Sequence, residues 1–232
     1  MHRKVNDKMI SVAIDGPVGA GKSTIARECA KRLGFIYADT GALYRAIGLY
    51  AVRKGVDSEA EDFAEKTAAL LPEITVEIKL ENGTQKVFLC GEDVSGEIRQ
   101  PEISMAASAV SAIPAVRDFL LELQRSIARE NNVLMDGRDI GTVVLPSADV
   151  KIFITASPEI RARRRFEELV HKGVETDFDQ VLADLNRRDY QDSHRAVAPL
   201  KMADNAVLLD TSELDFEQSV QAVLDLVRVK TN

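Results

Sequence analysis

Residues 10–24, ISVAIDGPVGAGKST, decide the fold of this chain. The stretch begins with an apolar run from Ile10 to Ile14 that predicts a buried strand. Residues 16–23 then match the pattern G-x-x-x-x-G-K-[ST], and apolar residues at helical spacing continue to Leu33. A glycine-rich loop between a strand and a helix is the setting of a P-loop. The sequence therefore predicts that this loop binds a nucleoside triphosphate.

The residue types of the loop explain how it would hold phosphate. Glycines let successive backbone N–H groups point inward around an anion, and the helix N-terminus adds partial positive charge. Lys22 supplies a full charge for the β- and γ-phosphates, and the Ser23 hydroxyl is a ligand for Mg²⁺. The predicted triphosphate-binding residues are Gly16, Pro17, Val18, Gly19, Ala20, Gly21, Lys22, Ser23 and Thr24.

Length and charge limit the class of protein. A chain of 232 residues suits one α/β domain with a small insertion. A net charge of −7 argues against a nonspecific nucleic-acid or membrane surface, and no apolar run approaches the ~20 residues of a membrane span. The polar residues 1–8 lack the apolar core of a secretory signal. We expect a disordered tail at 1–8 and one cytoplasmic domain at 9–232.

The cysteines agree with a reducing compartment. Cys29 and Cys90 are far apart in the sequence and show no metal-ligand spacing. We therefore predict two inert core residues and no disulfide.

Strand and helix patterns alternate along most of the chain. Strands are predicted at residues 10–14, 35–38, 133–135, 150–155 and 206–209. Helices are predicted at residues 23–33, 43–55, 58–71, 101–112, 114–130, 158–171, 177–190 and 215–229. This order predicts a doubly wound α/β fold, with a five-stranded parallel sheet covered by helices on both faces.

One segment interrupts the alternation. Residues 74–80 alternate apolar and polar side chains, Asn82-Gly83 is typical of a type I′ turn, and Val87–Leu89 resumes the apolar pattern. We predict that residues 73–97 form a small antiparallel β insertion. Just before it, Ser58–Glu61 has the sequence of a capping box, which predicts the start of a helix.

Polar motifs follow several predicted strands. Asp39-Thr40-Gly41, Asp136–Asp139 and Ala156-Ser157 each come directly after one. Ligands of parallel α/β sheets bind beyond the carboxyl ends of the strands. We therefore expect these motifs to meet the P-loop at one edge of the sheet.

Arginines are concentrated near the same positions of this acidic chain. They are Arg45, Arg138, the group Arg161, Arg163, Arg164 and Arg165, and the group Arg187, Arg188 and Arg195. A guanidinium group suits bidentate recognition of phosphate, so the set predicts a site that neutralises several phosphates.

No side chain stands out as a general base. None of the histidines, His2, His171 and His194, is expected to reach the P-loop. A hydroxyl acceptor usually needs a group that deprotonates it, whereas a phosphate acceptor is already an anionic nucleophile. The pattern favours transfer between phosphates, with Asp136 or Asp139 as the alternative base for a hydroxyl acceptor.

Five motifs together resemble the bacterial cytidylate kinases over nearly the whole chain. In order they are GPVGAGKST, DTGALYRA, GEDVSGEIR, DGRDIGTVV and RAVAPL. The resemblance implies transfer of the γ-phosphoryl group of ATP to CMP or dCMP, giving ADP and CDP or dCDP, with Mg²⁺. It also implies that the 73–97 insertion belongs to the monophosphate site.

The resemblance assigns roles to three groups of residues in the acceptor site. The CMP phosphate would be held by Arg45, beside Thr40 and Tyr44, and Arg138 and Arg195 would clamp phosphate at the reaction centre. The cytosine would be recognised by Ser108, Arg117 and Asp139. The ribose would contact Arg188 and Asp192.

The resemblance also implies a lid over ATP. Residues 157–195 would form the lid and the helix after it, with Arg161 and Arg165 over the nucleotide. The catalytic set would be Lys22, Arg138, Arg161, Arg165 and Arg195. Asp136 would either contact the ligand or only support the site.

Two rival functions remain open at this point. The first is another small P-loop kinase, acting on UMP, AMP or a hydroxyl group. The second is a GTPase-like switch, because Asp93–Gly96 matches D-x-x-G, although no N-K-x-D motif accompanies it. We expect a monomer that binds small nucleotides and no nucleic acid.

Overall fold

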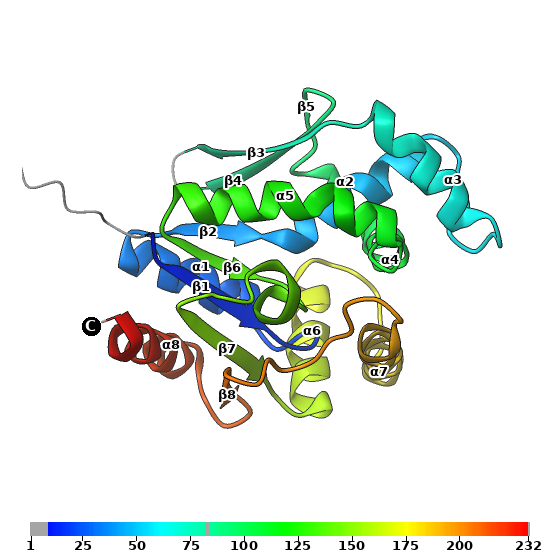
Figure 1. The fold of residues 1–232 in the computed structure, drawn as a ribbon. Coiled ribbons are helices and arrows are strands. Elements are labelled where there is room, and N and C mark those ends of the chain that lie inside the picture. Colours follow the sequence, from blue (N-terminus) through cyan, green and yellow to red (C-terminus); the bar gives the residue numbers. More distant parts are fainter. Residues whose placement is uncertain (1–8, 82–83, 232) are drawn as a thin grey trace, which may run out of the picture.

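The computed structural model describes residues 9–81 and 84–231, so the predicted tail and the Asn82-Gly83 turn lie outside the described residues. A central sheet has its strands in the order β2-β6-β1-β7-β8, and all neighbours are parallel (Figure 1). The strands are β1 (Ser11–Asp15), β2 (Ile36–Asp39), β6 (Val133–Asp136), β7 (Val150–Thr155) and β8 (Val207–Asp210). The predicted doubly wound, five-stranded α/β fold is confirmed.

Side chains of the central strand β1 alternate between two apolar layers. Val12 and Ile14 pack with α1 (Lys22–Leu33) and α8 (Phe216–Thr231). Ala13, between them, packs on the other face against α5 (Pro114–Glu130). Because β1 is covered on both faces, a ligand can reach this part of the sheet only at the ends of its strands.

The other helices correspond to predicted segments. They are α2 (Thr40–Arg53), α3 (Phe63–Leu70), α4 (Pro101–Val110), α6 (Pro158–His171) and α7 (Phe178–His194). The start of α3 and the end of α7 differ from the prediction. Three short turns that the sequence patterns did not predict are η1 (Leu71–Glu73), η2 (Glu97–Arg99) and the π-helical η3 (Ile140–Val144).

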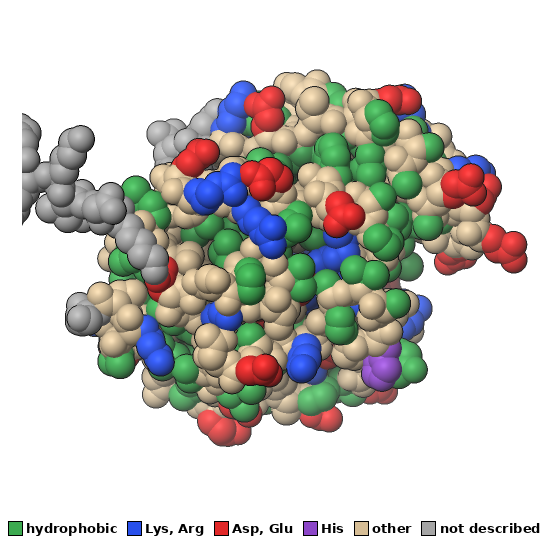
Figure 2. Space-filling model, in the orientation of Figure 1, with side chains coloured by type: hydrophobic (Ala, Val, Ile, Leu, Met, Phe, Trp, Pro, Cys, Tyr) green, Lys and Arg blue, Asp and Glu red, His purple; other side chains and the backbone are tan. Residues whose placement is uncertain are grey.

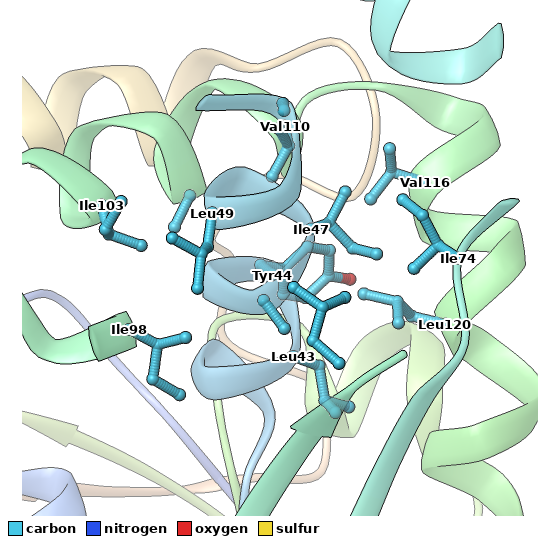
Figure 3. Close-up of a cluster of buried hydrophobic side chains, with 14 of the residues drawn as sticks. Leu43, Tyr44, Ile47, Leu49, Ile74, Ile98, Ile103, Val110, Val116 and Leu120 are labelled. Carbon is cyan, nitrogen blue, oxygen red and sulfur yellow. The ribbon is translucent and has the colours of Figure 1, made fainter. Parts of the chain in front are cut away.

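The insertion forms a separate three-stranded antiparallel sheet. Its strands are β3 (Val76–Glu81), β4 (Thr84–Leu89) and β5 (Glu92–Asp93). It shares an apolar core with α2, α4 and α5, in which Leu43, Ile47 and Leu120 come together (Figure 3). Gln85 joins this sheet to the end of β2, because its side-chain amide accepts from the Asp39 N–H at 2.8 Å and donates to the Asp39 carbonyl at 3.3 Å.

Three local predictions were wrong. No capping box forms at Ser58–Glu61, because the Asp57 carboxylate accepts from the Glu59 N–H in a turn and α3 begins only at Phe63. Cys90 is an exposed free cysteine, whereas Cys29 is buried as predicted. The helix α7 continues to His194, four residues beyond its predicted end.

Candidate active site

A cavity of about 810 Å³ opens beside the P-loop, where β2 and β6 end. It is lined by side chains from the P-loop, α2, α4, α5, α6, α7 and the loop after β6. The predicted site residues that line it are Val18, Gly19, Gly21, Lys22, Ser23, Thr24, Thr40, Tyr44, Arg45, Ser108, Arg117, Asp136, Arg138, Asp139, Arg165, Arg188, Asp192 and Arg195. The structure therefore brings most of the predicted set to one place.

The P-loop turns back over the end of β1 and enters α1 at Lys22. Gly19 and Gly21 have φ angles of +75° and +82°, a left-handed conformation that glycine adopts without strain. Gly16 is required by space, since a Cβ there would lie 1.9 Å from the Ile154 carbonyl oxygen. The Lys22 Nζ donates to the Pro17 carbonyl at 2.7 Å, and burial together with the charge of Arg138 lowers its pKa.

Four predicted residues do not line the cavity. Gly16, Pro17 and Ala20 form the inner side of the loop, and Ala20 is fully buried. Arg161 is buried beneath the loop, where it donates to the carbonyls of Ala156 at 2.8 Å and Val18 at 2.9 Å. Its Nε and Nη1 groups hold the loop, so the structure does not place Arg161 in the cavity, where its predicted position over ATP would require it.

Asp136, at the end of β6, links the sheet to the P-loop. Its carboxylate accepts from the Ser23 hydroxyl at 2.7 Å and from the Tyr37 hydroxyl at 3.2 Å. Burial raises the pKa of this carboxyl group, with a further contribution from the nearby Asp39. Thr40 adds a second link between neighbouring strands, because its hydroxyl donates to the Asp136 carbonyl at 2.8 Å. Asp136 thus both lines the cavity and supports the loop.

Farther into the cavity, Asp139 lies between two arginines. Arg117 is paired with one carboxylate oxygen, and an Arg195 nitrogen lies 3.4 Å from the other. The Arg117 guanidinium also stands over the Tyr44 ring, 5.6 Å from its centre. Burial raises the pKa of Asp139, and the charge of Arg117 opposes that rise. The arrangement presents a carboxylate and fixed guanidinium donors side by side.

A second group of arginines is less fully paired. Arg138 donates to Asp192 at 2.8 Å, whereas Arg45 donates to the Ile98 carbonyl at 3.2 Å. The Nε atom of Arg188 is buried and has no hydrogen-bond partner among the described residues. Burial and the charge of Arg138 lower the pKa of Arg188 to about 10. A buried donor of this kind gains a hydrogen-bond partner when an oxygen atom of a ligand binds beside it.

Two supporting residues, Asp15 and Asp189, were not predicted from the sequence. Asp15 accepts from the backbone N–H groups of Ile140 at 2.7 Å and Gly141 at 2.8 Å. The available signal was an acidic residue at the end of a buried strand, directly before the first glycine of the P-loop. Asp189 supports the loop from α7, since it accepts from the Val18 N–H at 3.3 Å.

The GTPase-like interpretation receives no support from the position of its motif. Asp93 does not line the cavity and pairs instead with Lys86 at 2.7 Å. His171 and His194 also lie outside the cavity lining.

Two other kinds of feature are missing from residues 9–81 and 84–231. Within these ranges there is no group of three or more His, Cys, Asp or Glu side chains that could hold a metal ion. No single helix there is long and apolar enough to cross a membrane; α4 and α5 reach that length together but are bent by 96° at their junction.

Comparison with known proteins places this geometry in a family. The model of the family described as cytidylate kinase matches residues 12–229. The cytidylate kinase of Caldicellulosiruptor saccharolyticus is 49% identical over 219 residues, which cover 94% of this chain and 96% of the relative. The cytidylate kinase of Caldanaerobacter subterraneus subsp. tengcongensis is 50% identical, and the alignment covers 96% of this chain and 96% of the relative. That of Lactobacillus johnsonii is 46% identical, and the alignment covers 99% of each chain. The chain therefore belongs to the cytidylate kinase family.

Proposed function

We propose that this protein transfers the γ-phosphoryl group of ATP to CMP or dCMP, giving ADP and CDP or dCDP. The observation that carries the proposal is one continuous cavity with the P-loop and Lys22 at one end and the Asp139 carboxylate between Arg117 and Arg195 at the other. The first end suits a triphosphate, and the second suits a base that offers both an amine and hydrogen-bond acceptors.

On the donor side, the amides of the P-loop and the N-terminus of α1 face the β- and γ-phosphates of ATP. Lys22 exchanges its contact with the Pro17 carbonyl for a phosphate oxygen, whose negative charge favours the protonated amine. The nucleoside lies along the part of the cavity beside Arg164, Leu214 and Phe216, which adjoins Ser23 and Thr24. Arg165 also lines the cavity from α6, where it pairs with Glu168 at 2.8 Å.

On the acceptor side, Asp139 accepts from the N4 amine of cytosine, while Arg117 and Ser108 donate to O2 or N3. Uracil would place a carbonyl against the carboxylate and is rejected for that reason. Asp192 and Arg188 hold the ribose, with Thr40 and Tyr44 on the side of α2. Arg45, Arg138 and Arg195 hold the monophosphate.

Catalysis then requires positioning and charge neutralisation. An oxygen of the CMP phosphate, already anionic, attacks the γ-phosphorus in line with the departing ADP, so no general base is needed. Lys22, Arg138, Arg195 and Arg165 neutralise charge on the transferring group. Arg161 acts indirectly, by fixing the Val18 carbonyl and hence the shape of the P-loop.

The residues at the P-loop suit Mg²⁺. Ser23 and Asp136 provide hard oxygen ligands beside the phosphate site, and Mg²⁺ is usually held by one or two side chains together with phosphate oxygens and water. When bound, the ion neutralises charge on the β- and γ-phosphates. Removal of divalent ions with EDTA should therefore abolish turnover, and added Mg²⁺ should restore it.

We also propose roles for two segments of the chain outside the P-loop. Residues 73–97 form the insertion that supports the acceptor site, and residues 157–195 form a lid whose closure excludes water from the transferring phosphoryl group. On the face in Figure 2, basic and acidic side chains are interspersed, which agrees with small nucleotides as ligands. We propose that the protein acts as a monomer in the cytoplasm.

An ADP-release assay with ATP and Mg²⁺ tests the activity. CMP, dCMP, UMP, AMP and a simple alcohol serve as acceptors in parallel, and GTP alone tests for switch-like hydrolysis. We expect CMP and dCMP to stimulate ADP release far above the rate with ATP alone, and UMP to do so much less. Preference for UMP, AMP or the alcohol would refute the proposal, as would GTP hydrolysis that CMP leaves unchanged.

A further inference from the structure

The π-helical turn η3 follows Asp139 directly and is held by side chains at both ends. The Val144 and Leu145 N–H groups donate to the carbonyls of Asp139 and Ile140, at 3.2 and 2.7 Å, which is the wide spacing of a π-helix. A turn this short leaves its first N–H groups and its last carbonyls without partners inside the turn. These groups need partners from elsewhere in the fold.

At the first end the partner is Asp15, the last residue of β1. One carboxylate oxygen accepts from the Ile140 N–H at 2.7 Å, and the other accepts from the Gly141 N–H at 2.8 Å. Asp15 is only 4% exposed, so water does not compete for these bonds. A carboxylate at the N-terminal amides of a helical turn is also favoured by the direction of the peptide dipoles.

At the other end the partner is Arg125 of α5. Its Nε donates to the Val144 carbonyl and its Nη2 donates to the Val143 carbonyl, both at 3.1 Å. Two parallel bonds from one planar guanidinium fix both the distance and the orientation of the turn. Charged groups of opposite sign, from two different elements, thus hold the two ends of η3.

Close packing leaves the turn little freedom to move. A Cβ on Gly141 would lie 3.3 Å from the Asp15 Oδ2 atom and 3.2 Å from the side chain of Lys151. A Cβ on Gly137 would lie 2.7 Å from the Ile140 side chain and 2.8 Å from the Thr40 hydroxyl. The backbone on either side of Asp139 is therefore confined.

The consequence falls on Asp139. Its own carbonyl accepts from the N–H groups of Val143 and Val144, and the two amides that follow it are held by Asp15. Neither Asp15 nor Arg125 lines the cavity. We propose that Asp15 and Arg125 are positioning residues that hold η3 at its two ends and thereby aim the Asp139 carboxylate at the acceptor base. This inference rests on the proposed role of Asp139 in recognising cytosine.

Steady-state kinetics of full-length variants test the inference. Arg125→Met removes the support at the last carbonyls of η3. Asp15→Asn removes one of the two acceptors at its first amides and places an NH2 donor there, and Arg125→Lys keeps the charge but not the paired geometry. Arg129→Met is the matched control on the same helix, where Arg129 is exposed and forms a salt bridge with Glu122. The values of kcat and KM are measured for CMP and UMP at saturating ATP, together with KM for ATP and Tm.

A second control matches Asp15. Asp149 also binds an amide of β1, since its carboxylate accepts from the Ser11 N–H at 3.0 Å, but at the opposite end of the strand. Asp149→Asn should therefore leave the ratio of kcat/KM for CMP over UMP unchanged, as should Arg129→Met.

We expect Arg125→Met and Asp15→Asn to raise KM for CMP by about 10- to 100-fold and to lower the CMP-over-UMP ratio by a similar factor. Arg125→Met should keep KM for ATP within about twofold, because it does not contact the P-loop, and Arg125→Lys should recover part of the loss. A role in stability alone would lower Tm without changing the ratio.

Wild-type selectivity and KM in folded Arg125→Met protein would overturn the inference. If that variant does not fold, the same values in Asp15→Asn would overturn it. A third variant, Asp139→Asn, distinguishes failure of the positioning role from failure of the proposed function. Unchanged selectivity in Asp139→Asn refutes recognition by Asp139, whereas altered selectivity there with wild-type values in the other two variants refutes only the positioning role.

Discussion

Asp15 is expected to lower the stability of the protein at neutral pH, and replacing it by Asn tests this. Burial raises the pKa of its carboxyl group to about 6 from an ordinary value of 3.8, although the amides of Gly141 and Ile140 oppose the rise. The neighbouring charge of Asp139 adds to the increase, and that of Lys22 reduces it. The folded protein therefore binds a proton more tightly at this site than the unfolded chain does.

The sign and size of the effect follow from linkage. A group whose pKa is higher in the folded state contributes stability below pH 4, and that contribution is lost as the pH rises through about 6. The full loss is about 3 kcal/mol, nearly all of it present at pH 8, whereas about half is present at pH 5. Asn has the size of the protonated acid and does not titrate, so Asp15→Asn escapes this loss.

Urea unfolding of wild type and Asp15→Asn at pH 5 and pH 8 measures the difference. Circular dichroism is the suitable signal, because the chain contains no tryptophan. The free energy of unfolding of the variant, relative to wild type, should increase by about 1.5 kcal/mol from pH 5 to pH 8. Any constant cost of the substitution cancels in this comparison, and Asp149→Asn serves as the control for removing a carboxylate.

A relative stability that is flat between the two pH values, or that falls toward pH 8, would refute the reasoning. Agreement with the expected increase, together with the kinetic loss expected above, would mean that this buried charge is retained for the site at the expense of stability.

Three further substitutions test other parts of the site. Arg188→Met should raise KM for CMP by about 10- to 100-fold while leaving KM for ATP unchanged, because it removes a buried donor that lacks a partner among the described residues. Arg161→Met should raise KM for ATP and lower the free energy of unfolding by about 3 kcal/mol. The reason is that Asp189 and the Val18 carbonyl lose the Arg161 guanidinium. An unchanged KM for ATP would contradict the role of Arg161 beneath the P-loop. Gly16→Ala should abolish ATP binding in calorimetry, since its Cβ would overlap the Ile154 carbonyl, and wild-type affinity would contradict this close approach of the loop to β7.

The positions of Arg161 and Arg165 could not be predicted from helical spacing. Arg161 and Arg165 are four residues apart and were expected to act together over ATP. In the fold, the first turn of α6 lies beneath the P-loop, so Arg161 is 4% exposed and holds the loop. One turn later, Arg165 reaches the cavity. Helical spacing gives a shared face, but only the packing of α6 decides what each position along that face meets.

The strands, most helices, the P-loop and most of the residues at the sheet edge could be predicted from the amino-acid sequence. These features depend on periodicity, turn chemistry and capping, all of which act over a few residues. Three features depend on how the chain packs: Cys90 is exposed, Arg188 has a buried donor without a partner among the described residues, and η3 is held at both ends. Asp15 is separated along the sequence from the two amides that it binds in η3 by 125 and 126 residues. No local sequence pattern encodes such a contact, because it forms only when distant segments pack together.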